Sequence, residues 1–493
     1  MRRINNIKML LFYRPILNIA RLNFHIYLVL LVVITSCSGL IKVTPPFTSV
    51  NKDNVFENDA TASSVLTNLY ANLSSANISA NGSISSLFLY SGLAADELKL
   101  FALDNSQYNT FYYNTLNENS ETGFWSSSYS TIYSANMAID GLTTSTKITS
   151  GVKQQLLGEA KFIRAFCYFY LVNLFGDVPL VTDTDPLKNA TLSRSSIELV
   201  YSQIYNDLED AKKLLSEDFR GANVLVGTSE RVRPTKWAAS ALLARAYLYR
   251  GNYELSEKEA NEVLQMSSLF SIDSLNAVFL KNSNECIWQL QTVSNSNGNT
   301  GEGNFFILPS TGPNTSTYPV YLSKFLINSF EENDQRKSHW IDSIMLADSS
   351  ATYYYAYKYK SGALTPPNTY TEYEMVLRLG EQYLIRSEAR AQLGNIAGAK
   401  EDLNVIRKRA GLGETVAENK DQLISAILHE RQVELFTEWG HRWFDLKRTK
   451  TIDDVMNIVA LDKGTTWSSN WALWPLYLPD ISADHNLVQN EGY

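Results

Sequence analysis

The sequence predicts a mainly α-helical protein, in which tetratricopeptide-like helix hairpins form a right-handed scaffold packed against an irregular, loop-rich portion with a few short strands. Three observations predict this class: a long apolar repeat with helical spacing, two segments that share a helix, Gly-Asn, helix pattern, and polar loops between the helical segments. The chain has 493 residues, of which 45% are hydrophobic, so it has enough apolar residues for a large core.

The strongest helical signal covers residues 156–174. Its apolar positions recur every three or four residues, as expected for a helix face that packs on a core. They are Leu157, Ala160, Ile163, Phe166, Cys167, Tyr170, Leu171 and Leu174. Gly176 follows and is the expected end of this helix. Residues 124–135 have the same spacing through Trp125, Tyr129 and Ile132, which predicts a second helix.

Two segments resemble each other in a way that is typical of tetratricopeptide hairpins. Residues 246–256 and 389–399 each place a Gly-Asn pair between two helical stretches. Glycine permits a tight turn, and small residues let the two helices approach closely. The predicted hairpins pair residues 237–250 with 253–266, 375–393 with 396–410, 152–174 with 197–215, and 421–437 with the helix that follows.

The N-terminus has the pattern of a bacterial lipoprotein signal. Five basic residues and no acidic ones precede an apolar run at 24–34, which stops at Thr35-Ser36-Cys37. The run is too short to span a bilayer comfortably, so residues 1–36 are expected to be a cleaved signal peptide, with Cys37 as the lipidated first residue. The alternative is an ordinary secretory signal that a cysteine happens to follow.

Charge and composition argue against several classes of function. The formal net charge of −8 becomes more negative by five units when residues 1–36 are removed, and no basic face for nucleic acid is evident. Cys167 and Cys286 are the remaining cysteines, and both are expected to be buried thiols rather than reactive ones. The histidines have no metal-ligand spacing, so neither a metal nor a cofactor is expected.

Three glutamates in the last predicted hairpin raise the question of catalysis. Glu430, Glu434 and Glu438 recur every four residues, which places them on one helix face. A carboxylate pair for glycoside hydrolysis is one interpretation. The favoured interpretation is a structural ion-pair network, because stacked carboxylates repel one another unless cations lie between them. The expected cations are Arg386, Arg390, Arg431, Arg442 and Arg448.

Five blocks of sequence resemble the SusD/RagB family of outer-membrane lipoproteins of Bacteroidetes. They cover residues 158–180, 378–395, 402–411, 430–448 and 489–493. The first is similar to the family's signature helix and turn, and the last to its QNPGY terminus, with Glu491 in place of the usual proline. The resemblance divides the mature chain into an N-terminal SusD-like region, 37–230, and a C-terminal RagB/SusD-like region, 231–493, within one body.

The resemblance implies a non-catalytic protein, anchored in the outer membrane and exposed at the cell surface. Such a protein binds a nutrient, most often an oligosaccharide, and delivers it to a partner, a SusC-like TonB-dependent transporter. Two alternatives remain open: a lid or scaffold that contacts only protein, and a cell-surface glycoside hydrolase.

A glycan site requires exposed aromatic rings beside polar side chains, because sugars have apolar C–H faces and many hydroxyl groups. Two loop regions, 96–113 and 304–321, supply this mixture, and a polar loop at 294–304 precedes the second. For each ring, packing in the core is the competing interpretation. The candidate ligand-binding residues are Asp96, Phe101, Tyr108, Phe305, Phe306 and Tyr318.

Overall fold

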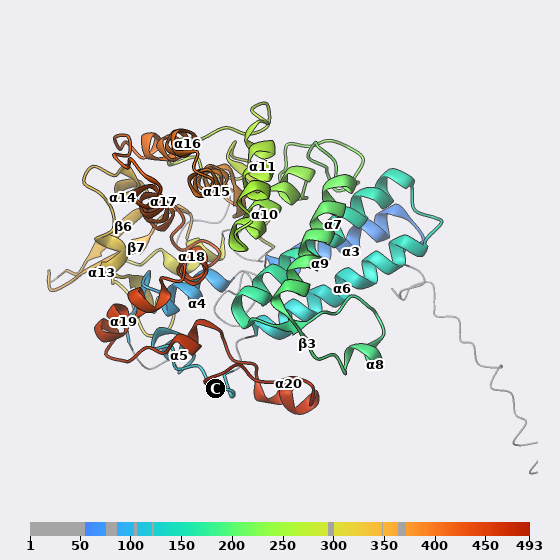
Figure 1. The fold of residues 1–493 in the computed structure, drawn as a ribbon, viewed down its shortest axis with the longest axis horizontal. Helices are drawn as coiled ribbons and strands as arrows, with labels where there is room; N and C mark the ends of the chain where they lie inside the picture. The colour runs from blue at the N-terminus through green and yellow to red at the C-terminus, as the bar shows by residue number, and fades with distance from the viewer. Residues whose placement is uncertain are drawn as a thin grey trace, which may run out of the picture. The chain divides into compact units, whose positions relative to one another are not determined.

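Helices that pack on one another in sequence order dominate the part of the chain that the structure describes (Figure 1). The computed structural model describes residues 55–74, 86–102, 106–120, 123–293, 300–347, 349–362 and 371–493. The predicted signal peptide, Cys37 and residues 294–299 of the predicted loop lie outside these ranges. Residues Val55–Tyr493 form one compact unit. The predicted regional boundary at 230/231 stays a prediction.

The mainly helical class is confirmed. The helices of the first half are α3 (Asp59–Leu73), α4 (Leu87–Ala94), α5 (Ser106–Tyr112), α6 (Phe124–Thr144), α7 (Ser150–Phe175), α8 (Pro186–Asn189), α9 (Ile197–Leu214), α10 (Lys236–Tyr249) and α11 (Tyr253–Leu264). Those of the second half are α12 (Gly301–Phe306), α13 (Lys324–Ile327), α14 (Gln335–His339), α15 (Leu379–Gln392), α16 (Ile396–Arg409), α17 (Lys420–Glu434), α18 (His441–Arg448), α19 (Ile452–Lys463), the 3-10 helix η2 (Ser469–Ala472) and α20 (Leu478–Ala483). None of the helices in the described ranges is both long and apolar enough to cross a membrane.

The strands are short and form two-stranded antiparallel pairs within the described residues. The pairs are β1 (Leu98–Leu100) with β5 (Val320–Leu322), β2 (Val178–Pro179) with β3 (Arg194–Ser195), β4 (Cys286–Leu290) with β8 (Glu374–Arg378), and β6 (Ile341–Met345) with β7 (Thr352–Ala356).

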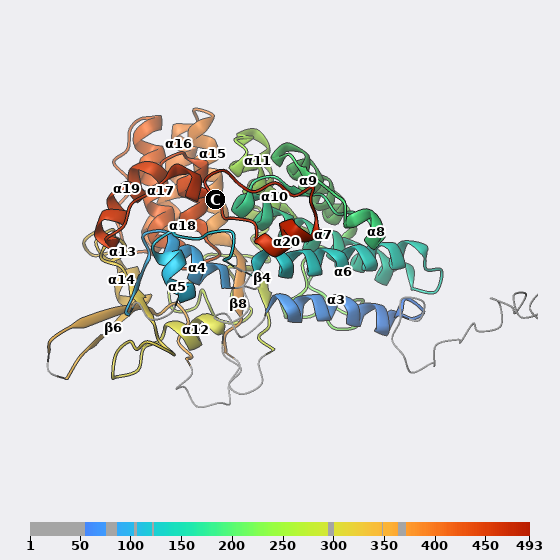
Figure 2. The ribbon, with the colours of Figure 1, turned by 90° about the horizontal axis from the view of Figure 1, so that it is seen from below.

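The predicted hairpins build a continuous series of packed helices. In order, α6 packs on α7, α7 on α9, α9 on α10, α10 on α11, α11 on α15, and α15 on α16 and α17. Both ribbon views show α10, α11, α15 and α16 as neighbours (Figures 1 and 2). The apolar repeat at 156–174 lies within α7, which ends where Gly176 adopts a φ of +76°. The predicted fourth pair is α17 followed by α18.

The repeated Gly-Asn pair closes both central hairpins by the same mechanism. Gly251 and Gly394 have φ values of +71° and +84°, a left-handed conformation that glycine adopts without steric cost. The asparagine that follows each glycine caps the next helix: Asn252 Oδ1 accepts from Leu255 N at 3.4 Å, and Asn395 Oδ1 accepts from Gly398 N at 3.0 Å. The turn chemistry inferred from the sequence is therefore confirmed.

The predicted helix at 375–393 is wrong at its start. Its first residues belong to β8, which pairs with β4 in a register that places Met375 opposite Gln289 and Leu377 opposite Trp288. Every residue of both strands is buried. Consecutive apolar residues such as Met375, Val376 and Leu377 are typical of a strand buried on both faces. These residues therefore form a strand and not the first turn of the expected helix. The helix begins at Leu379.

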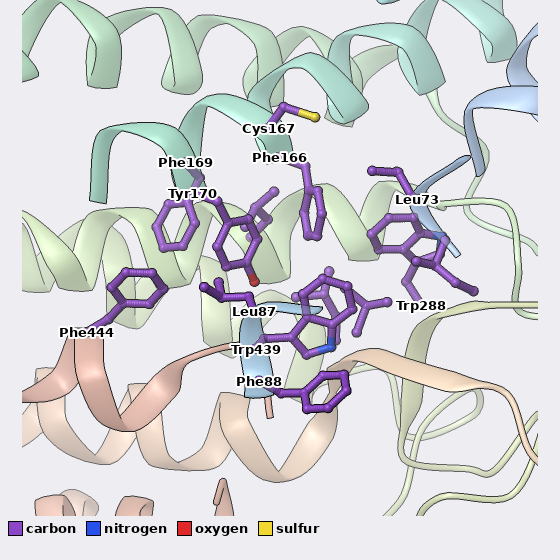
Figure 3. Close-up of a cluster of buried hydrophobic side chains, with 14 of the residues drawn as sticks. Leu73, Leu87, Phe88, Phe166, Cys167, Phe169, Tyr170, Trp288, Trp439 and Phe444 are labelled. Atoms are coloured by element: carbon purple, nitrogen blue, oxygen red, sulfur yellow. The ribbon is translucent and has the colours of Figure 1, made fainter. Parts of the chain in front are cut away.

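Aromatic rings fill the centre of the core (Figure 3). Phe166 of α7 packs edge to face on Trp288 at 5.3 Å and on Trp439 at 5.6 Å, measured between ring centroids. Contacts of this geometry stabilise a core beyond the area that they bury. Cys167 and Cys286 are buried thiols that form no disulfide, as predicted, and burial raises the pKa of both.

The C-terminal segment returns to the end of α7. Asn490 Nδ2 donates to the carbonyls of Phe175 at 2.9 Å and Trp474 at 2.7 Å, and its Oδ1 accepts from Arg194 Nη2 at 2.6 Å. One side chain thus joins three segments. The terminal block at 489–493 is therefore a structural clamp on α7.

Candidate functional site

The two aromatic loop regions, 96–113 and 304–321, lie together in the structure. Strand β1 comes from the first region and β5 from the second, and their pairing places Lys99 opposite Tyr321. The chain continues the pairing after β1, since Phe101 N donates to Pro319 O at 2.8 Å. The β6–β7 hairpin, labelled in Figure 1, packs beside β5. Segments distant in sequence thus form one surface.

Three aromatic rings form a row on this surface, which we call the aromatic row: Phe101, Tyr353 and Tyr321. Tyr353 of β7 lies between the other two, with ring centroids 5.7 Å from Phe101 and 5.0 Å from Tyr321, both edge to face. Phe101 is 40% exposed, and the two tyrosines are partly exposed. Adjacent rings with accessible faces are what stacking against a flat ligand requires.

Polar groups flank the aromatic row. Lys99 is partly exposed opposite Tyr321 on the paired strand. Burial, together with Tyr353 and Asp462, raises the pKa of Tyr321, so its hydroxyl stays protonated at neutral pH. Asp462 forms an ion pair with Lys324. The row therefore has hydrogen-bonding groups at its edge.

Tyr354 lies next to Tyr353 in β7 and is 39% exposed. Because successive side chains of a strand point to opposite faces, its ring is directed away from the aromatic row. Tyr354 thus resembles Phe101 in exposure but belongs to another face.

Most of the candidate residues from the sequence lie beneath this surface. Phe305, Tyr318, Tyr108 and Phe306 are only 3–8% exposed. Tyr108 packs edge to face on Phe305, with 6.4 Å between ring centroids, so the two loop regions also meet in the core. Phe305 and Phe306 lie in α12, which extends into residues predicted to be a loop. Among the candidate rings, Phe101 is the one with a large exposed fraction.

Asp96 is buried and paired with a cation. Its carboxylate accepts two hydrogen bonds from Arg442, at 2.8 Å from Nε and 2.6 Å from Nη2. Its backbone carbonyl also accepts from the hydroxyl of Ser323, beside β5. The residue thus links the start of β1 to α18 and β5.

Tyr353 was missed by the sequence analysis, although a signal was present. Residues 353–357 read Tyr-Tyr-Tyr-Ala-Tyr, an aromatic run with strong strand preference. The run lies outside the two loop regions, and its place beside β5 depends on long-range pairing. An aromatic strand next to a predicted ligand region is a signal that could have identified it.

A buried charged group lies below α12. A cavity of about 10 Å³, the space of about one water molecule, is lined by residues that include Glu302, Lys358, Thr437 and Glu438. Burial raises the pKa of Glu302 to about 8 and lowers that of Lys358 to about 8. This space is too small for a sugar. Within the described ranges, no cluster of three or more His, Cys, Asp or Glu could hold a metal ion.

The three glutamates form an ion-pair network, as predicted, but with other cations. Glu430 pairs with Arg336 and Arg407, Glu434 with Arg336, Arg378 and Arg409, and Glu438 with Arg378 and Lys358. The expected arginines pair elsewhere: Arg386 and Arg390 with Asp402, Arg431 with Asp445, Arg442 with Asp96, and Arg448 with Glu388 and Asp445. Helix α17 also ends at Glu434, so Glu438 lies in the following turn.

The pKa shifts of the three carboxylates differ in direction. Burial raises the pKa of Glu430, the direction that a general acid in glycoside hydrolysis needs. Although burial opposes ionisation there too, the arginines lower the pKa of Glu434, and Arg378 and Lys358 lower that of Glu438. Glu430 has no exposed surface and is paired with Arg336 and Arg407, which leaves it no access to a substrate. All three carboxylates are buried and held by cations, so the geometry suits a structural role.

Comparison with known sequences identifies the family. The family described as "Starch-binding associating with outer membrane" matches residues 47–248, and the SusD family matches residues 314–493. A SusD-like protein of Formosa agariphila is 25% identical over 72% of this chain and 74% of its own length. A SusD-like protein of Bacteroides ovatus is 27% identical over 69% of this chain and 67% of its own length.

Solved structures share the fold. A SusD superfamily protein from Bacteroides vulgatus superposes with a TM-score of 0.76 at 20% identity, over 89% of this chain and all of that one (100%). A laminarin-binding SusD-like protein gives 0.72 at 24% identity, over 89% and 100% of the two chains. Surface glycan-binding protein A from Bacteroides uniformis gives 0.72 at 20% identity, over 88% and 99%. The family matches in both halves, the aligned relatives and the shared fold agree, and the chain belongs to the SusD family.

Proposed function

We propose that this protein is a cell-surface lipoprotein that binds a glycan at the aromatic row and delivers it to a SusC-like TonB-dependent transporter. Lipid chains on Cys37 would anchor it in the outer membrane, where each buried methylene contributes about 0.8 kcal/mol. The family's description as starch-binding and associated with the outer membrane supports this proposal. So do the names of two structural neighbours, one a laminarin-binding SusD-like protein and the other a surface glycan-binding protein.

The exposed aromatic row is the observation that carries the proposal. Phe101, Tyr353 and Tyr321 are neighbouring, partly exposed rings. The β1–β5 pairing holds the backbone of Tyr321, and the β6–β7 pairing holds that of Tyr353. The apolar face of a sugar ring stacks on such groups, and its hydroxyls bond to polar side chains at the edge. An open row also accommodates a polymer, which a closed pocket excludes.

Substitution of single rings tests the proposed site. We expect Phe101→Ala and Tyr353→Ala each to weaken binding of the cognate glycan by about 1–2 kcal/mol, the scale of losing one aromatic face. Isothermal titration calorimetry with starch and laminarin fragments would measure the change. Tyr354→Ala is the matched control, because it removes a ring of similar exposure from the opposite face. Equal affinity in all three variants would place the glycan elsewhere.

Partnership with a transporter needs its own test. Affinity purification of the tagged protein from its native outer membrane should recover a TonB-dependent transporter in near-equal amount. If the tagged protein recovers the transporter but binds no glycan itself, the lid-only alternative is favoured. If the tagged protein recovers no transporter, delivery to a transporter is contradicted.

A further inference from the structure

A cleft that shares no lining residue with the aromatic row lies elsewhere in the described part of the chain. It is a cleft of about 260 Å³ between α6, the segment around α8, and α20. Its walls include Trp125, Tyr129, Asn189, Asp480 and Asp484. This volume is near the lower end of small-molecule sites, which span about 300–1,000 Å³.

One wall is aromatic and firmly held. The rings of Trp125 and Tyr129 lie 4.9 Å apart, and Trp125 packs edge to face on Phe175 at 5.2 Å. The hydroxyl of Tyr129 donates to Pro179 O at 2.8 Å, which fixes its ring. Both rings remain partly exposed, so an apolar surface is presented to the cleft without further ordering cost.

The opposite wall is polar and acidic. Asp480 and Asp484 line it and are partly exposed. Asn189 Nδ2 donates to Asp183 O at 2.8 Å, whereas its Oδ1 is buried without a hydrogen-bond partner among the described residues. A buried acceptor without a partner costs free energy that a donor from a ligand would recover. The wall therefore offers acceptors to a ligand rich in hydroxyl groups.

A smaller cavity extends the site along the C-terminal segment. It has a volume of about 90 Å³ and shares Trp125 and Asp480 with the larger cleft. Tyr477 also lines it. Trp125 and Asp480 thus line both cavities. Two adjoining cavities suit two linked sugar rings better than a single sugar ring.

No lysine, arginine or histidine is among the residues that line either cavity in the described part of the chain. A phosphate, sulfate or uronic acid would meet the carboxylates of Asp480 and Asp484 there, and no cation among the lining residues. Aromatic faces beside carboxylate and amide acceptors match the C–H faces and hydroxyl donors of an uncharged sugar. The lining thus selects against anions.

We propose that this cleft is a second saccharide site, which takes one or two rings of a neutral glycan between Trp125 and Asp484. It operates independently of the aromatic row, since the two share no side chain. A glycan bound at both sites would be held at two separate points of the body. The site adds a binding function to the segment around α20, which precedes the terminal block that clamps α7.

The test uses the whole mature protein with the aromatic row disabled by Phe101→Ala and Tyr353→Ala. Saturation-transfer NMR with maltotriose, laminaritriose and cellotriose as probes should detect weak binding that persists in this background. Addition of Asp484→Ala or Trp125→Leu should weaken it at least tenfold. Asp454→Ala, which removes an exposed carboxylate of α19, is the matched control and should leave it unchanged.

Trp125→Leu also removes a contact with Phe175, so melting temperatures must be measured for every variant. Asp484 is partly exposed, and its replacement tests the site without a large change in packing. Absence of trisaccharide binding in the row-disabled background, or equal binding in Asp484→Ala, would overturn the proposal. Preferential binding of tetramethylammonium over all three sugars would also overturn it. Effects of Phe101→Ala and Tyr353→Ala in the parent protein report separately on the aromatic row.

Discussion

The Nη1 atom of Arg378 lies 2.6 Å from Oε1 of Glu434, and neither side chain is more than 2% exposed. Arg378 ends β8 and Glu434 ends α17, so this pair joins the strand layer to the last helix hairpin. Arg336 and Arg409 contact the same carboxylate. One anion thus compensates three buried cations from three different segments.

Replacement of the Glu434 carboxylate should destabilise the fold strongly. Glu434→Gln removes the carboxylate that three buried guanidinium groups share, although Arg336 keeps Glu430, Arg378 keeps Glu438 and Arg409 keeps Glu285. We expect the free energy of unfolding to fall by about 3 kcal/mol, the lower end of the range for a broken buried ion pair. Because Arg409 and the other arginines lower the pKa of Glu434, the loss should be full above pH 4.5 and disappear as the pH falls below it. Urea denaturation at several pH values measures this. The exposed pair of Glu198 with Arg250 provides the control, Glu198→Gln, which should melt with the parent.

The rings beneath the aromatic row should act on stability. Phe305→Ala removes a ring that is 8% exposed and contacts Tyr108, and it should cost about 3–5 kcal/mol of unfolding free energy. Tyr354→Ala, an exposed ring, should change it little. Chemical denaturation distinguishes the two. Unchanged stability with lost glycan affinity in Phe305→Ala would mean that this ring contacts the ligand directly.

Glu302 should make stability fall with rising pH. Its pKa is raised by burial to about 8 from an ordinary value of 4.5, so the folded state holds a proton that the unfolded state releases between these values. Stability linked to this group is therefore full below pH 4.5 and lost as the pH rises through 8. Glu302→Gln should melt like the parent at pH 5 and several degrees higher at pH 9. Glu414→Gln, at an exposed position, should show no such difference; a parallel pH profile for Glu302→Gln would contradict the burial argument.

Membrane attachment should depend on Cys37. Cys37→Ala removes the acylation site and should shift the mature protein from the membrane fraction to the soluble fraction, measured by ultracentrifugation and immunoblotting. The strain should lack the partner transporter, because the partner alone could retain the protein. Cys167→Ala is the matched cysteine control and should stay in the membrane fraction. Unchanged retention of Cys37→Ala in that strain would refute the anchor.

The helical scaffold could be predicted because local sequence patterns determine it. The apolar repeat of α7 and the Gly-Asn turns act within a few residues, so their geometry follows from spacing and backbone preference alone. Strand β8 was predicted to be helical because its strand conformation depends on pairing with β4, almost ninety positions earlier in the chain. The residues next to β8 in the sequence contain no signal for that pairing.

Long-range pairing also decided which candidate rings are exposed. Asp96 meets Arg442 across 346 positions, and Tyr108 of α5 meets Phe305 of α12, almost two hundred positions later. The sequence identified both aromatic regions, whereas the face of each ring depended on contacts that no local pattern encodes. The cations around Glu434 were missed for the same reason, since Arg336 and Arg378 lie on other segments.

The clamp formed by Asn490 has a consequence for the order in which the molecule matures. Phe175 O accepts from Arg194 Nη2 at 2.8 Å and from Asn490 Nδ2 at 2.9 Å, and the second donor lies 315 positions later in the chain. A polypeptide that emerges N-terminus first, from a ribosome or a translocation channel, therefore forms the Arg194 contact early and gains the Asn490 contact only when its final residues have followed. Asp480, Asp484 and Leu487, which line the Trp125 cleft, lie only a few positions before Asn490, so the cleft also takes shape only when the end of the chain has been made.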